Sequence, residues 1–179
     1  MSRVPPACRC RRSDDTSLSA VNESALQGIY NYRRLTDAIA TAGQPTEEEL
    51  EAVAQAGFEV VVNLALHGAE YSLSDEPGTV ESLGMRYIHI PVEWQRPLRA
   101  DLERFFEVMD QLEGRRVFVH CAANKRVSVF IALYRQLRLG WTAEAVMPDV
   151  LAVWEPDPVW SAYMREMSLP VHKPAAETR

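Results

Sequence analysis

Two short apolar runs constrain the fold of this chain more than any other feature of its sequence. Residues 58–66 read FEVVVNLAL and residues 116–120 read RVFVH, and neither run alternates polar with apolar positions. Strands that are apolar on both faces are typical of parallel sheets with helices on both sides. We also predict a strand over residues 85–90, which ends at Pro91.

Helical segments separate these strands. Residues 46–49 read T-x-x-E, a capping box, and Gly57 ends the helix that follows. Residues 67–78 are polar and predict a loop, whereas Thr142 is expected to cap a later helix that Pro148 should interrupt or restart. The expected buried side chains of the other helices are Leu102, Phe105, Phe106, Met109, Leu112, Phe130, Ile131, Tyr134, Leu137, Trp160 and Tyr163.

This alternation predicts an α/β fold, a three-layer sandwich with a mainly parallel central sheet flanked by helices. The length of 179 residues predicts one such domain over residues 25–169. We expect residues 1–24 to be a disordered tail and residues 170–179 to be a flexible one. Ligands of such folds bind beyond the carboxyl ends of the strands, so the residues after His120 are the place to look.

Composition excludes several classes of function. The formal net charge is −6 and the isoelectric point is near 5.3, which argues against broad nucleic-acid binding. No apolar run approaches the roughly 18 residues that a membrane span needs, and no apolar signal-peptide core follows the basic N-terminus. Three cysteines make no disulfide framework, so we expect a cytoplasmic protein. Cys8 and Cys10 resemble half a metal site, but nothing nearby completes it, and we expect no metal.

The predicted strand at residues 116–120 delivers Cys121 into a short turn that feeds directly into a helix. Backbone N–H groups at a helix N-terminus point at whatever lies in such a turn, and the helix dipole adds positive potential. Ala122 and Ala123 are small enough for the backbone to approach a ligand closely. Asn124 tolerates a positive φ better than most residues. The segment therefore predicts an anion cradle with a thiol at its base.

Two cations add to this potential. Lys125 and Arg126 follow the turn, and the combined field favours the nucleophilic thiolate of Cys121. A buried structural cysteine beside solvated charges is the alternative interpretation. The coincidence of strand, thiol, small turn, cations and helix favours an anion site, while catalysis is a separate question.

The segment resembles the cysteine-dependent phosphatase superfamily, especially bacterial dual-specificity-like members, whose motif is His-Cys-x5-Arg followed by Ser or Thr. The resemblance covers roughly residues 29–165. It includes AGQPT at 42–46 before a helix, then VVVNLAL, then RYIHIPVEW. It implies the fold predicted above and a phosphatase that needs no metal or other cofactor. In that family the cysteine attacks phosphorus, and the loop amides and the arginine hold the phosphoryl oxygens.

Three positions match the family motif directly. Cys121 matches the nucleophile, His120 matches the histidine that helps to keep it a thiolate, and Ser128 matches the hydroxyl that assists departure of phosphate. The phosphate-binding positions fall on Ala122, Ala123, Asn124, Lys125 and Val127.

The arginine departs from the motif. The family places it six residues after the cysteine, where this chain has Val127, whereas Arg126 is five residues after. Asn124 stands where the family often has glycine. One residue on a helix is about 100° of rotation, and a guanidinium fork cannot simply be moved that far. Either the loop is rebuilt so that Arg126 points inward, or phosphate binding is weakened.

The general acid also differs. The family carries an aspartate on the loop after the strand that ends at Pro91, and Glu93 is the carboxylate on that loop here. Glu93 is one methylene longer and could reach, although a surface glutamate is an equal alternative. Asp101 is a weaker candidate because it should lie in the next helix.

Three functions remain open. The first is a phosphatase that hydrolyses phosphotyrosine-type or small phosphomonoesters through a cysteinyl-phosphate on Cys121. The second is a catalytically impaired module that binds a phosphorylated small molecule or phosphoprotein. The third is a rhodanese-like sulfurtransferase, because Cys-x4-Arg occurs in such proteins. The sequence predicts neither the substrate nor the oligomeric state.

Overall fold

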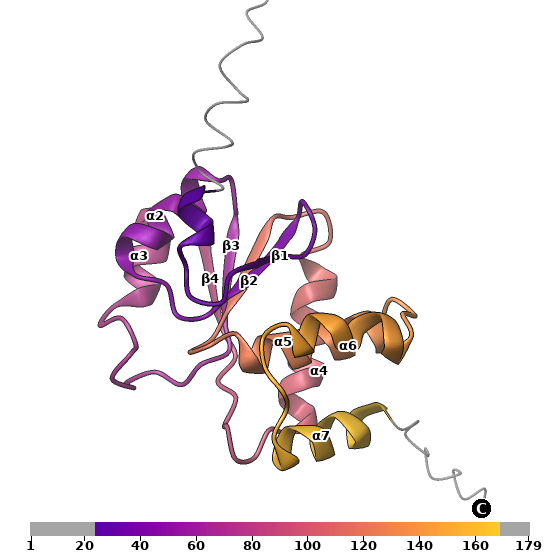
Figure 1. Ribbon diagram of the computed structural model, residues 1–179. Helices are drawn as coiled ribbons and strands as arrows, with labels where there is room; N and C mark the ends of the chain where they lie inside the picture. Colours follow the sequence, from indigo (N-terminus) through magenta and orange to yellow (C-terminus); the bar gives the residue numbers. More distant parts are fainter. Residues whose placement is uncertain (1–23, 169–179) are drawn as a thin grey trace, which may run out of the picture.

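The computed structural model describes residues 24–168 and has a five-stranded sheet at its centre (Figure 1). The strand order is β1-β2-β5-β3-β4, and every neighbouring pair is parallel except β1 with β2. The strands are β1 (Arg33–Arg34), β2 (Ile39–Ala42), β3 (Val60–Asn63), β4 (Arg86–His89) and β5 (Val117–His120).

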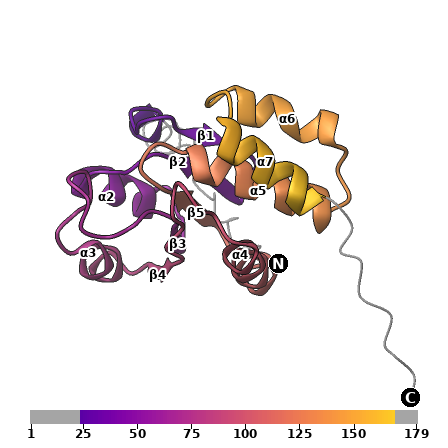
Figure 2. The same cartoon turned by 90° about the horizontal axis from the view of Figure 1, so that it is seen from below.

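Helices cover both faces of this sheet. They are α2 (Glu47–Gln55), α3 (Glu76–Ser82), α4 (Arg99–Gln111), α5 (Lys125–Leu137), α6 (Ala143–Leu151) and α7 (Pro158–Ser168). Figure 2 shows α2 and α3 on one side of the sheet and α4, α5, α6 and α7 on the other. The predicted three-layer α/β fold with a mainly parallel sheet is therefore confirmed.

Two separate cores explain why the central strands do not alternate between buried and exposed side chains. Val60 and Val62 of β3 pack into the core beneath α4 to α7, and Val61 packs into the core beneath α2 and α3. Phe118 of β5 joins the same core as Val61. β3 and β5 are buried at every position because both of their faces are covered.

Several helix boundaries follow local sequence signals. Thr46 Oγ1 accepts a hydrogen bond from Glu49 N at 3.2 Å, and Glu49 Oε2 accepts one from Thr46 N at 2.8 Å. This is the predicted capping box, and it starts α2. Gly57 follows the helix with a φ of +82°, as a helix-ending glycine should.

Three expectations about the helices were wrong, of which two concern α3 and α5. Residues 67–78 are not all loop, because α3 begins at Glu76, with the Asp75 carboxylate accepting from Gly78 N at 3.0 Å. Leu137 was expected to be buried but is 42% exposed. It is the last residue of α5, where the helix leaves the core.

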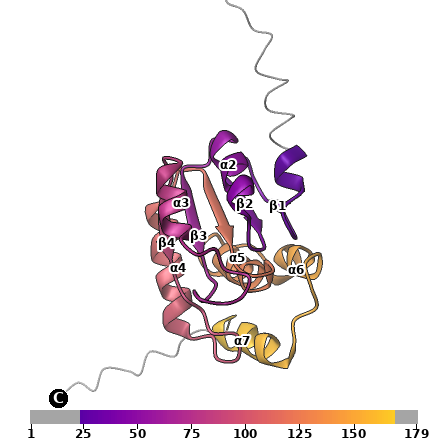
Figure 3. The same ribbon diagram turned by 90° about the vertical axis from the view of Figure 1, so that its left-hand side faces the viewer.

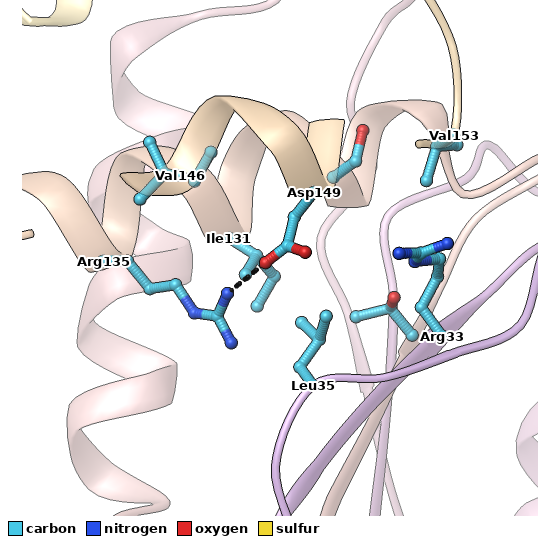
Figure 4. A pocket seen from close by; sticks show the side chains of 10 residues that line it. Arg33, Leu35, Ile131, Arg135, Val146, Asp149 and Val153 are labelled. Carbon is cyan, nitrogen blue, oxygen red and sulfur yellow. Dashed lines mark hydrogen bonds and ion pairs between the residues drawn. The ribbon is translucent and has the colours of Figure 1, made fainter. Parts of the chain in front are cut away.

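Pro148 does not interrupt its helix, contrary to expectation, and α6 runs through it. A proline inside a helix costs about 3 kcal/mol, and packing on both sides of it offsets this cost. Val146 and Val150 are buried against α5. The residue after Pro148, Asp149, forms an ion pair with Arg135 of α5, and their Oδ2 and Nη1 atoms lie 2.6 Å apart (Figure 4). The space beside this pair, about 10 Å³, holds no more than a water.

The parallel strands β2, β5, β3 and β4 have their carboxyl ends at the same edge of the sheet. Figure 3 shows α7 lying beyond that edge. None of the helices in residues 24–168 is long and apolar enough to cross a membrane. Apart from residue 24, which begins a helical turn, the predicted tails lie outside the described residues, as do Cys8 and Cys10.

Candidate active site

The turn between β5 and α5 contains Cys121. β5 ends at His120 and α5 begins at Lys125, so four residues make the turn. Cys121 is 1% exposed, and its N–H donates to Ala42 O at 3.4 Å. Asn124 is the N-cap residue of α5 and has a φ of +61°, as its tolerance of positive φ suggested. The thiol therefore lies at the base of a turn that faces the N-terminus of α5.

Side-chain amides hold this turn in place. The Asn124 Nδ2 group is buried and donates to Asn31 O at 2.8 Å and to Thr41 Oγ1 at 3.0 Å. Asn31 Nδ2 in turn donates to Ala123 O at 3.1 Å. Asparagine at position 124 thus supplies both the left-handed backbone and a tether that glycine would lack.

The segment after β2 lies directly against the turn. Gln44 N donates to Ala122 O at 3.2 Å, and Gly43 N donates to Tyr30 O at 2.7 Å. A Cβ on Gly43 would lie 2.8 Å from Tyr30 Cδ1 and 3.0 Å from Ala122 O. Glycine is required at position 43 because no side chain fits between these two segments.

Arg126 points inward. It is 6% exposed, its Cζ lies 5.6 Å from the centre of the Trp94 ring, and its Nε has no hydrogen-bond partner within residues 24–168. Val127, where the family motif has arginine, is fully buried in the core beneath α4 to α7. Because α5 starts at Lys125, Arg126 faces the loop that carries Trp94, and Val127 faces the core.

Tryptophans flank the first turn of α5. Lys125 is half-buried, and its Nζ lies 5.2 Å from the Trp154 ring centre and 5.9 Å from that of Trp94. The Trp94 carbonyl accepts a hydrogen bond from Trp160 Nε1 at 3.1 Å, which joins the loop after β4 to α7. Lys125 and Arg126 are thus both held against aromatic rings, and Arg126 is the more deeply buried.

Behind the turn, His120 contacts a residue that sequence reasoning missed. His120 is fully buried, and its Nε2 lies 2.5 Å from Oε1 of Glu76, which is 2% exposed. Glu76 falls in the stretch expected to be a polar loop, so only the tertiary structure reveals its burial. A buried glutamate has no local sequence signal.

Two other predicted site residues are Ser128, which lies in α5, and Glu93, which lies in the loop after β4. The Ser128 hydroxyl donates to Lys125 O at 2.8 Å and accepts from Trp154 Nε1 at 3.2 Å, so it is engaged with α5 and Trp154. Glu93 is exposed on the loop that carries Trp94. Trp94 brings this loop beside Arg126. Among the described residues, no group of three or more His, Cys, Asp or Glu side chains is placed to hold a metal ion.

Comparisons with known proteins agree with this geometry. A family model described as "DSP-PTPase phosphatase fused to NAD+ Kinase" matches residues 14–150. A DUF442 protein of Shewanella putrefaciens CN-32 is 35% identical in sequence, with a TM-score of 0.72 over 81% of this chain and 95% of that one. TpbA of P. aeruginosa, solved in complex with pTyr, is 17% identical with a TM-score of 0.63 over 78% of this chain and 88% of that one, and shows the fold alone.

A curated relative shares part of its length with this chain. The "Beta-lactamase hydrolase-like protein" of Agrobacterium fabrum is 28% identical over 106 residues, which are 56% of this chain and 24% of that protein. The chain thus matches about a quarter of that relative. The family model covers most of this chain, and the structure has the same fold as the DUF442 protein. The chain therefore belongs to this DSP-PTPase family of cysteine-dependent phosphatases.

Proposed function

We propose that this protein hydrolyses phosphomonoesters through a cysteinyl-phosphate intermediate on Cys121. One observation carries the proposal. Arg126 is buried at the start of α5 with an unpartnered Nε, five residues after the thiol. A buried donor without a partner costs free energy that a bound anion would recover. This unpartnered donor supports an oxyanion site in the loop that holds Cys121.

The chemistry follows from this arrangement. The Cys121 thiolate attacks phosphorus and forms the S–P bond while the bond from phosphorus to the leaving oxygen breaks. The loop amides and the Arg126 guanidinium stabilise the charge on the phosphoryl oxygens. A water molecule then attacks phosphorus, the S–P bond breaks, and inorganic phosphate leaves with the thiolate restored. Amides and one guanidinium supply the stabilisation, so the proposed cycle uses no metal.

Glu93 is the proposed proton donor to the leaving oxygen, and its carboxylate takes a proton back from the water that attacks phosphorus. It is exposed on the loop that Trp94 holds beside Arg126, so it can move toward a bound substrate. Ser128 has its hydroxyl on Lys125 and Trp154. It would assist release of phosphate only after leaving these partners.

The proposed substrates are phosphotyrosine-type or small phosphorylated compounds in the cytoplasm. The pTyr complex of TpbA, a structural neighbour, supports the first class. Trp94 and Trp154, the two half-buried tryptophans beside Lys125, offer an apolar wall that suits a planar leaving group.

The test is hydrolysis of an aryl phosphate between pH 5 and 8 by the wild type and by Cys121→Ser. Loss of a catalytic nucleophile costs roughly 10⁴-fold or more in turnover, and we expect a loss of that size with the fold retained. Circular dichroism checks the fold. Retained activity in Cys121→Ser would refute the assignment. Vanadate binding without turnover by the wild type would instead indicate a binding module.

A further inference from the structure

Glu76 is a buried carboxylate held by three segments of the sheet edge. Its Oε1 lies 2.5 Å from His120 Nε2 at the end of β5. Its Oε2 accepts hydrogen bonds from Gln44 Nε2, after β2, at 3.2 Å and from Asn63 Nδ2, at the end of β3, at 3.1 Å. The carboxylate is therefore fixed directly behind the residue that precedes Cys121.

Glu76 is ionised at neutral pH. Burial acts to raise its pKa, but the contact with His120 and the hydrogen bond from Gln44 lower it more, so that the pKa lies below its ordinary value. A carboxylate that remains charged cannot serve as the proton donor to a leaving group. It can instead attract a proton to the imidazole that it touches, because a buried charge needs an opposite one.

The other groups facing Glu76 do not supply that opposite charge directly. Asn63 Nδ2 also donates to Tyr87 Oη at 3.0 Å, and His67 Nε2 lies 2.9 Å from the same hydroxyl. The rings of His67 and His89 stack with centroids 3.7 Å apart, and His89 Nε2 lies 2.7 Å from Ala65 O. Burial lowers the pKa of His89, which keeps that ring neutral at neutral pH.

We propose that Glu76 is a positioning residue for Cys121: it holds His120 oriented and protonated behind the thiol, so that the imidazolium stabilises the thiolate. The proposal rests on the role proposed for Cys121 and adds Glu76 to the residues that set its reactivity. Nothing in the reaction is transferred to Glu76. Its proposed effect on the thiol passes through His120, while its other oxygen holds Gln44 and Asn63.

The test measures the reactivity of the thiol and not turnover. Full-length wild type, Glu76→Gln and Glu81→Gln are alkylated with iodoacetamide from pH 5 to 9, and the adduct is quantified on the Cys121 peptide, apart from Cys8 and Cys10. Glu81 is an exposed glutamate on the same helix, so its variant is the matched control. We expect the Glu76→Gln profile to move up by about one pH unit, a roughly tenfold loss of rate on its acid side.

A Glu76→Gln profile that superimposes on the wild type in a folded protein would overturn the proposal. If that variant does not fold, nitrogen NMR of the His120 imidazole in the wild type decides. A doubly protonated ring at pH 7 is expected, and a neutral ring would overturn the proposal. Both readouts are independent of hydrolysis, so a failure of the proposed phosphatase activity would be seen separately.

Discussion

At the scale of single residues, the start of α5 at Lys125 determines where Arg126 and Val127 lie. Lys125 is the first residue of α5, and the guanidinium of Arg126 lies beside Trp94 in the loop after β4. Val127, about 100° further round the helix, contributes to the core. Arg126, in the first turn of the helix that left-handed Asn124 caps, is thus buried beside Trp94.

Replacing the two neighbouring cations one at a time tests whether Arg126 is an oxyanion clamp. Arg126→Ala should weaken vanadate or phosphate binding by about 10²-fold, the order expected for a lost preorganised donor. Lys125→Ala should weaken binding far less, because Lys125 is half-buried between two tryptophan rings. Isothermal titration with vanadate measures both. Equal losses in the two variants would show diffuse charge and no clamp.

At the scale of elements, local sequence signals predicted α2, β3 and β5, whereas tertiary contacts determine α3 and the unbroken helix α6. The capping box placed α2, and the apolar runs placed β3 and β5. The stretch containing α3 is polar, and the burial of Glu76 depends on His120, which is 44 residues away in the chain. Pro148 stays helical because α5 holds both sides of it. Contacts of this range leave no local pattern for a sequence to show.

Gly43→Ala tests how far the segment after β2 shapes the turn that holds Cys121. The added Cβ would meet Tyr30 Cδ1 at 2.8 Å and Ala122 O at 3.0 Å, so one segment must shift. Overpacking of this kind costs about 1–3 kcal/mol. We expect a lower Tm together with weaker vanadate affinity, because Ala122 belongs to the turn.

Gly28→Ala is the control for this change. Its Cβ would meet only Ala25 O, at 3.3 Å, and it lies outside the catalytic turn. Calorimetry and vanadate titration are run on both variants. Unchanged vanadate affinity in Gly43→Ala would show that the segment after β2 does not shape the turn that holds Cys121, which would contradict this account.

At the scale of the whole molecule, both sheet faces are covered by helices and the polar side chains gather at the carboxyl edge. Glu76, His120, Asn63 and Gln44 are tied together there beneath the turn that holds Cys121. The fold thus places one buried charge network in the same region as the thiol. The stability of the protein should then depend on the charge state of that network.

Acid should destabilise the protein through Glu76. Its pKa in the folded protein is lowered, so its contribution to stability is complete above the ordinary glutamate pKa. That contribution is lost progressively as the pH falls through the lower folded value. The Tm of the wild type should therefore drop more steeply than that of Glu76→Gln as the pH is lowered from 6 to 3. Parallel curves would contradict the assigned charge.

The central claim is that phosphorus becomes bonded to Cys121 during turnover. The most direct test is rapid acid quench of the wild type mixed with an aryl phosphate, followed by peptide mass spectrometry. The account predicts a phosphoryl adduct on the Cys121 peptide within one turnover, and its absence in Cys121→Ser. Turnover without any adduct on Cys121, or with an adduct on another residue, would contradict it.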